Sequence, residues 1–241
     1  MKAGFSSESP AQAVPPPTTD SALPGRWWRG VLTWWPVKMA GTAIGMMVFF
    51  FAYFQVLHHP FRPVTIMPLT AIDRWIGFQP EALPLYLSLW CYILLAPALV
   101  VDRRELVSFG AAWVALAASG LGVFLFWPTA VPAATIDWSR HPAVAFLKAA
   151  DATGNACPSL HVAFAVFSAI WLGRHLGRLG ASRVVRGANW LWCAGILYAT
   201  IAIRQHVFLD VLAGAGLGLA VALAHLRWLG AGRSSPVRPP W

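Results

Sequence analysis

Long apolar runs alternate with short polar segments along most of the chain. Six runs, at about residues 37–57, 83–101, 107–127, 158–177, 187–204 and 207–229, each approach the roughly 20 residues that a helix needs to cross a membrane. The fourth and fifth are the weakest, and Arg174 interrupts the fourth near its end. A long cationic side chain there can reach the interface. The pattern therefore predicts an all-α, polytopic membrane protein with six transmembrane helices.

The two ends of the chain lack such runs. Residues 1–25 include Pro15, Pro16 and Pro17 among Ser, Thr and Ala, without the apolar core of a cleaved signal peptide. We expect a disordered cytoplasmic tail over residues 1–25, a six-helix membrane domain over residues 26–230, and a second cytoplasmic tail over residues 231–241.

Composition supports a membrane protein and gives its orientation. Hydrophobic residues make up 58% of the chain and charged residues 11%, whereas soluble domains carry roughly 25% charged residues. The net charge of +9 needs no nucleic acid partner, because membrane proteins retain Lys and Arg on cytoplasmic loops. With a cytoplasmic N-terminus, thirteen cations lie inside and five outside. We therefore expect an integral protein of a bacterial inner membrane, with both termini cytoplasmic.

Two outside loops, about residues 58–82 and 128–157, are long for simple connections. Within the second, His141 to Asp151 predicts a short helix that could cover an outward-facing pocket. In the last run, Gly214 and Gly218 are spaced for close approach of a neighbouring helix. Cys157 is interpreted as a packed small residue, since no sequence feature lowers its pKa.

Three ionisable residues stand at span ends, where a structural helix would need none. His161 begins the fourth predicted span, and His206 and Asp210 begin the last. The topology returns both histidines to the outer face. His206 and Asp210 are four residues apart, so on a helix they share a face and the carboxylate can orient the imidazole. One histidine can then act as a nucleophile or base, and the other as an acid.

The segment before His161 predicts an anion site. Pro158 fits the first turn of a helix, so the N–H groups of Ser159 and Leu160 would point out of the helix N-terminus, which favours phosphate. The Ser159 hydroxyl would add a further donor. Asn155 either caps this helix or holds the loop. Together with the histidines, these groups suit phosphoryl chemistry without a metal or other cofactor.

These motifs resemble a known family. Pro158-Ser159-Leu160-His161, with His206-x-x-x-Asp210 in a later span, is similar to the type 2 phosphatidic acid phosphatase (PAP2) superfamily of membrane lipid phosphatases. The resemblance runs from about Phe61 to Gly218. Within the superfamily, the chain is most similar to the inositol phosphorylceramide synthase-like branch. The residues that carry this second likeness are Asp151, Asn155, Pro128-Thr129, Pro68-Leu69-Thr70 and Asp73.

The resemblance implies roles for the three ionisable residues. His206 would attack phosphorus to form a phosphohistidine, Asp210 would orient His206, and His161 would protonate the departing alkoxide. The substrate would be a phospholipid or other lipid phosphate in the bilayer, dephosphorylated at the outer face.

Two parts of the family pattern are missing. The first motif would need Lys at Gln55, before Arg62-Pro63, and the third would need Ser-Arg where Ala199 and Thr200 stand. The phosphate's cationic partners are therefore open. The outside candidates are Arg204, Arg140, Lys148 and Arg62.

Two alternatives remain open. The same catalytic residues could transfer a lipid headgroup, as in inositol phosphorylceramide or sphingomyelin synthases of sphingolipid metabolism, with an acceptor pocket formed by loops 58–82 and 128–157. The remote alternative is a metal-binding membrane protein, since imidazole and carboxylate also suit divalent cations. An effect of chelator on activity would distinguish the metal alternative.

Overall fold

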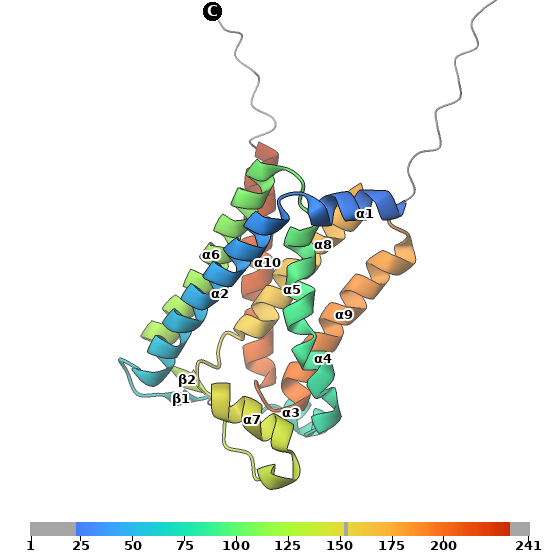
Figure 1. Cartoon of the computed structure of the whole chain (residues 1–241). Coiled ribbons are helices and arrows are strands. Elements are labelled where there is room, and N and C mark those ends of the chain that lie inside the picture. The colour runs from blue at the N-terminus through green and yellow to red at the C-terminus, as the bar shows by residue number, and fades with distance from the viewer. Residues whose placement is uncertain (1–22, 152–153, 232–241) are drawn as a thin grey trace, which may run out of the picture.

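Helices make up about three quarters of the residues that the structure describes. The computed structural model describes residues 23–151 and 154–231. In chain order its elements are α1 Leu23–Leu32, α2 Trp35–His58, β1 Thr65–Ile66, α3 Ala71–Ile76, η1 Pro80–Ala82, α4 Leu83–Leu87, α5 Leu89–Ala98, α6 Arg103–Phe126, β2 Thr129–Ala130, η2 Trp138–Arg140, α7 Pro142–Asp151, α8 Leu160–Arg178, α9 Arg183–Ala202 and α10 Phe208–Ala231 (Figure 1).

Five helical stretches of the described chain are long and apolar enough to cross a membrane. They are Trp35–His58, Pro80–Ala98, Arg103–Phe126, Leu160–Arg178 and Phe208–Leu229. Each lies within a few residues of a predicted span. The remaining predicted span, 187–204, falls on α9, which is 20 residues long but is not among the five. Its first half carries Arg183, Arg186 and Asn189, which lower its mean hydropathy.

Helix α1 lies across one end of the bundle (Figure 1). It begins at Leu23. Residues 1–22 and 232–241, which make up most of the two predicted tails, lie outside the described part. The Lys38 ammonium donates to the carbonyls of Gly30 in α1 (2.7 Å) and Ala98 in α5 (2.8 Å). The Trp34 indole N–H donates to Val101 O at 3.0 Å. These bonds fix α1 against the α5–α6 connection.

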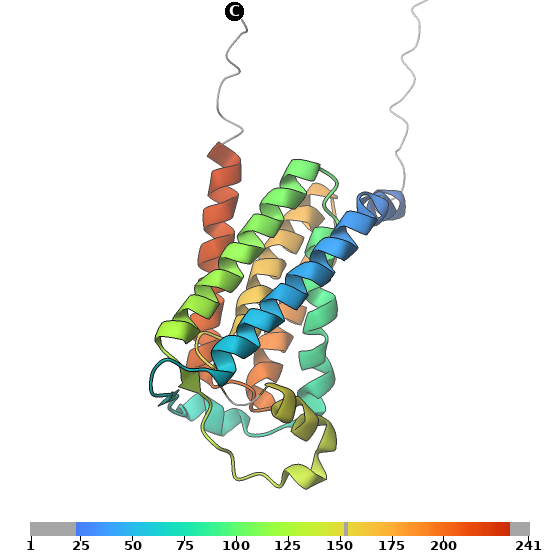
Figure 2. The same cartoon turned by 60° about the vertical axis from the view of Figure 1, so that its left-hand side comes forward.

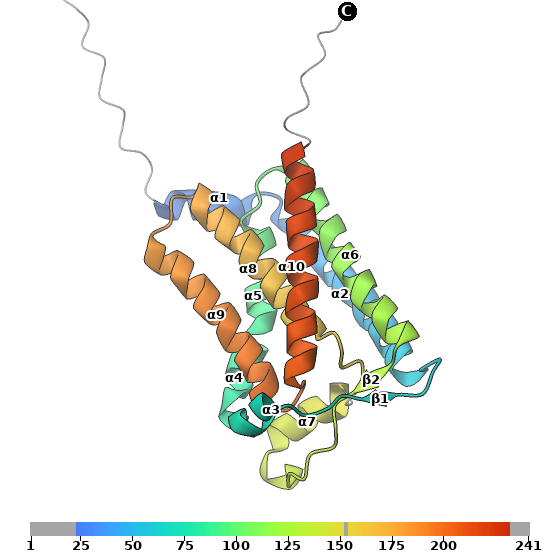
Figure 3. The same ribbon diagram turned by 180° about the vertical axis from the view of Figure 1, so that it is seen from behind.

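Helix α8 is the centre of the bundle. It packs against α5, α9 and α10, and 67% of its apolar stretch is buried, against 33% or less for the other four. Figure 2 shows α2 beside α6, and Figure 3 shows α10 running along α8. A Cβ at Gly214 or Gly218 would collide with the backbone of Ser159 or Ala163 in this contact. The predicted close approach at these two glycines is confirmed.

The two long loops and the α9–α10 connection gather at the end of the bundle opposite to α1 and to the last turn of α10 (Figure 1). Strands β1 and β2 pair in parallel, Thr65 with Thr129 and Ile66 with Ala130, and Ala130 also bridges to Gly154. The predicted short helix is present as α7. These contacts join the two long loops into one layer over the end of the bundle, where His161 and His206 lie.

Candidate active site

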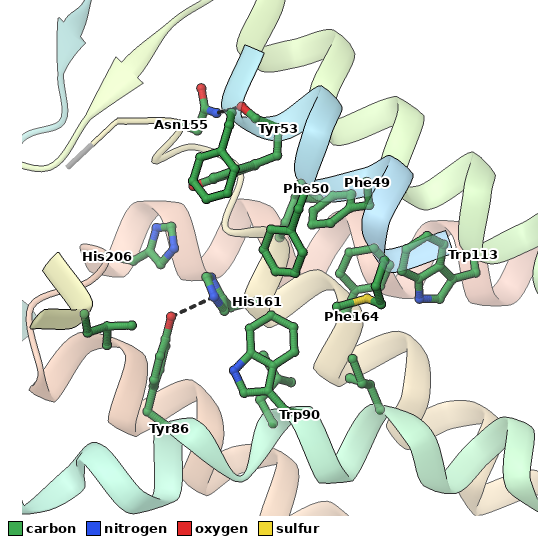
Figure 4. Close-up of a pocket in the computed structure, with 16 residues that line it drawn as sticks. Phe49, Phe50, Tyr53, Tyr86, Trp90, Trp113, Asn155, His161, Phe164 and His206 are labelled. Atoms are coloured by element: carbon green, nitrogen blue, oxygen red, sulfur yellow. Dashed lines mark hydrogen bonds between the residues drawn. The ribbon is translucent and has the colours of Figure 1, made fainter. Parts of the chain in front are cut away.

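The two histidines predicted to act together do meet. His161 lies in the first turn of α8, and His206 lies in the loop between α9 and α10. Their ring centroids are 5.6 Å apart, and both rings face the same cavity (Figure 4). Helices that are far apart in sequence therefore bring two imidazoles to one place at one end of the bundle.

Asp210 lies directly behind His206. Its carboxylate is fully buried, and Oδ2 lies 3.5 Å from His206 Nδ1. This separation exceeds a hydrogen bond, but such bonds are often long in an unliganded site and shorten when substrate binds. The same Oδ2 accepts the Val207 N–H at 3.0 Å. A fixed, buried anion at the back of the imidazole can orient it and stabilise its charged form.

The prediction that His206 shares a helix face with Asp210 was wrong in its geometry. Helix α10 begins at Phe208, so His206 precedes it by two residues. Two carboxylates cap the helix at this point. Asp210 accepts the N–H of Val207, just before the helix, and Asp73 Oδ1 accepts the N–H of Phe208, its first residue, at 2.7 Å. The spacing of four residues still brings the two groups together, through a capped turn.

Asp73 thus connects the β1–α3 loop with the start of α10, next to the site. It is fully buried, and its Oδ2 accepts the N–H and the hydroxyl of Thr70, each at 2.7 Å. Its other oxygen caps α10. Thr70 and Asp73 carried part of the family likeness but had no assigned role. Their role is structural: they tie the β1–α3 loop to the helix that presents Asp210.

Sequence reasoning missed Tyr86. Its hydroxyl lies 2.7 Å from His161 Nε2, and only 1% of the residue is exposed. Figure 4 shows this hydrogen bond at the rim of the cavity. The only signal in the sequence was a tyrosine near the outer end of the second predicted span, at the level of His161.

The start of α8 differs from the prediction. The helix begins at Leu160, with Ser159 as its N-cap, so Pro158 precedes the cap instead of lying in the first turn. The Ser159 N–H is not available to an anion, because it donates to the carbonyl of Asp210 at 3.0 Å. The Ser159 hydroxyl accepts the Val162 N–H at 3.4 Å. Leu160 is the first helical residue, and its side chain packs against Gly120.

Asn155 holds the preceding loop and does not cap α8. Its side-chain amide donates to Tyr53 O in α2 at 3.2 Å, and it is buried beside the cavity. Thr129 secures the same loop, because its hydroxyl accepts the Cys157 N–H at 2.7 Å. Asp151 is the last residue of α7, and its side chain lies outside the described part.

Two of the four candidate cations belong to segments that meet near the histidines. Lys148 of α7 donates to the carbonyl of Arg204 at 2.7 Å, and Arg204 is two residues before His206. Its φ of 62° places it in the left-handed region. Arg140 at the end of η2 and Arg62 are both exposed on the outer loops.

Cys157 lies close to this site but is unsuited to act as a nucleophile. It is buried, and burial, together with the nearby negative charge of Asp210, raises the pKa of its thiol to about 11. A thiol with so high a pKa stays protonated at neutral pH, and the thiolate is the reactive form.

Among residues 23–151 and 154–231, no three His, Cys, Asp or Glu side chains are placed to hold one metal ion. What the arrangement does offer is two adjacent imidazoles, one with a buried carboxylate behind it and one with a tyrosine hydroxyl. Such a pair can supply a nucleophile and a proton donor to one substrate atom.

Fold and site together define a helical membrane protein with a histidine pair suited to phosphoryl transfer. The sequence profile of the PAP2 superfamily matches residues 36–233. The chain belongs to this superfamily, whose membrane enzymes are phosphatases or phosphotransferases acting on lipid phosphates. No curated protein and no solved structure matched the chain.

Proposed function

We propose that this protein is an integral membrane phosphatase that removes the phosphate group from a lipid through a phosphohistidine on His206. The observation that carries the proposal is the position of the two histidines. The centroids of the His161 and His206 rings are 5.6 Å apart, and the buried Asp210 carboxylate lies behind His206. Membership of the PAP2 superfamily supports the same chemistry.

The reaction has two steps. In the first, His206 attacks phosphorus, the bond from phosphorus to the lipid oxygen breaks, and His161 gives its proton to that oxygen. In the second, His161 takes a proton from water, the water oxygen attacks the phosphohistidine, and inorganic phosphate leaves. Asp210 stabilises the positive charge on His206 between the steps. Arg204 and Lys148 are the first candidates to bind the phosphate oxygens, followed by Arg140, Arg62 and the Leu160 N–H.

The orientation is part of the proposal. The excess of Lys and Arg on one set of segments favours cytoplasmic termini, in a bacterial inner membrane, and places His161 and His206 on the extracytoplasmic side. Helix α9 runs along the bundle beside α8, α4 and α10 (Figure 3), which supports a sixth crossing. Its polar first half would then lie at the cytoplasmic interface.

A trapping experiment tests the mechanism. Purified protein is mixed with 32P-labelled farnesyl phosphate or 32P-labelled phosphatidate and quenched in alkali, which preserves phosphohistidine. We expect the wild type to become labelled, the variant Asp210→Asn to become labelled more slowly, and His206→Ala to stay unlabelled. His175→Ala is the matched control, because His175 is also buried but lies near the other end of α8. Label on His206→Ala equal to wild type would refute the proposal.

The same preparation tests metal dependence. We expect turnover to survive EDTA. Abolition by EDTA, with recovery on adding a divalent cation, would favour metal-assisted hydrolysis instead.

A second candidate is transfer of the phosphoryl headgroup to an alcohol, as in the inositol phosphorylceramide synthase-like branch. The observation that favours it is the pairing of β1 with β2, which joins loops 58–82 and 128–157 over the site. That layer could hold an acceptor. Adding inositol or glycerol to the labelled reaction separates the two, since a transferase gives a labelled alcohol phosphate and a phosphatase gives inorganic phosphate.

A further inference from the structure

A cavity of about 150 Å³ extends from the two catalytic histidines into the bundle. Its walls come from α2, α4, α5, α6 and α8, and Leu147 of α7 covers its outer side. Most of the lining is aromatic (Figure 4). The aromatic lining residues, apart from the histidines, are Phe49, Phe50, Tyr53, Phe54, Tyr86, Trp90, Trp113 and Phe164.

The cavity points toward the middle of the membrane. On α2 the lining positions 46, 49, 50, 53 and 54 form one helical stripe. From Phe54 to Met46 this stripe rises by about 12 Å at 1.5 Å per residue. Met46 lies near the midpoint of Trp35–His58, whereas the histidines lie at the outer end. A hydrocarbon chain in the cavity would therefore run inward from the phosphate.

The size of the cavity admits one chain and not two. An apolar cavity of about this volume accommodates one benzene, about six carbon atoms. Two acyl chains side by side would need at least twice that space along their whole length. The cavity therefore fits the first carbons of a single chain.

The lining next to the histidines is also unsuited to ester groups. The Tyr86 hydroxyl is bonded to His161, and the Asn155 amide donates to the Tyr53 carbonyl. Apart from the indole N–H groups of Trp90 and Trp113 and the Tyr53 hydroxyl, the lining around them is carbon. A glycerolipid would bring ester carbonyls, and a sphingolipid an amide or amine with a hydroxyl, within a few atoms of the phosphate. Polar groups buried there would lose hydrogen bonds with water, which is costly.

We infer that the substrate is a single-chain lipid phosphate whose hydrocarbon begins at the phosphate ester oxygen, that is, an alkyl or isoprenyl phosphate. This inference rests on the proposed phosphatase function and deepens it. The phosphate lies at His161 and His206, and the first carbons of the chain lie among the aromatic rings.

The first test compares substrates in one detergent: farnesyl phosphate, dodecyl phosphate, decanoyl lysophosphatidate and dihexanoyl phosphatidate. We expect kcat/KM to be about tenfold or more higher for the first two. A tenfold ratio corresponds to about 1.4 kcal/mol, which is within the cost of one buried acceptor without a partner. Equal or higher kcat/KM for either glycerolipid would overturn the inference while leaving the phosphatase function intact.

The second test uses two adjacent methionines. Met46 lines the deep end of the cavity, whereas Met47 is 72% exposed on the outside of α2. Met46→Phe should lower kcat/KM for farnesyl phosphate severalfold relative to ethyl phosphate, whose two carbon atoms occupy only the outer end. Met47→Phe should leave that ratio unchanged.

Equal ratios for the two methionine variants would place the chain elsewhere and overturn the inference. If wild type releases phosphate from none of these substrates, nor from p-nitrophenyl phosphate, the phosphatase proposal itself fails and the inference fails with it. Gel filtration of each variant confirms that the proteins compared are folded.

Discussion

The hydrogen bond between Tyr86 and His161 allows a quantitative prediction about the proton transfer that we propose for His161. Tyr86→Phe keeps the buried ring and removes only the hydroxyl, which lies 2.7 Å from His161 Nε2. The imidazole then loses the partner that fixes its orientation. Loss of a hydrogen bond that leaves a buried polar atom unpaired costs about 1–3 kcal/mol. If that cost falls on the transition state, kcat/KM drops by about 5- to 150-fold.

The loss should depend on the leaving group. An alkoxide needs a proton as it departs, so hydrolysis of dodecyl phosphate should show the full effect. p-Nitrophenolate needs little protonation, so p-nitrophenyl phosphate should lose less than about threefold. The measurement is the ratio of variant to wild-type kcat/KM for each substrate across pH.

Tyr92→Phe is the matched control. Tyr92 is buried on the same run of helices, and its hydroxyl donates to Asn189 Oδ1 at 2.7 Å, away from the histidines. The Tyr92→Phe substitution should lower thermal stability by about as much as Tyr86→Phe does, and should leave kcat/KM unchanged for both substrates. Equal losses for the two substrates in Tyr86→Phe, or equal activities of the two variants, would refute a positioning role for Tyr86.

Two further predictions concern packing and thiol reactivity. Gly214→Ala places a Cβ against the backbone at the start of α8, so we expect the free energy of unfolding to fall by about 1–3 kcal/mol and the Tm in detergent to fall with it. In the control Gly216→Ala the new Cβ meets nothing within 4 Å, so this substitution should be neutral or slightly stabilising. A Gly214→Ala protein as stable as wild type would contradict the observed helix contact. Cys157, with its pKa raised to about 11, should react with N-ethylmaleimide far more slowly at pH 7.5 than free glutathione does. Its rate should rise about tenfold per pH unit up to its pKa, because only the thiolate reacts. Equal rates for Cys157 and glutathione at pH 7.5, measured by mass spectrometry, would show that this reasoning is wrong.

The sequence by itself determined the helical membrane fold and the histidine pair. The length and composition of an apolar run can be read directly from the sequence, and five of the six predicted spans correspond to apolar helices. The spacing of His206 and Asp210 brought those two groups within 3.5 Å, although through a capped turn and not on one helix. The span lengths and the spacing of His206 and Asp210 are local, and a local pattern is what a sequence displays directly. The meeting of His161 with His206 followed instead from the predicted order of spans, which returns both to one face.

The tertiary structure alone decided how the site is built. Tyr86 meets His161 across 75 residues, and Asp73 caps α10 across 135 residues. The aromatic cavity combines side chains from separate helices, and the Ser159 N–H is taken by Asp210 where α8 and α10 touch. Such contacts depend on how helices pack, and helix packing is set by many weak side-chain fits that no single stretch of sequence contains.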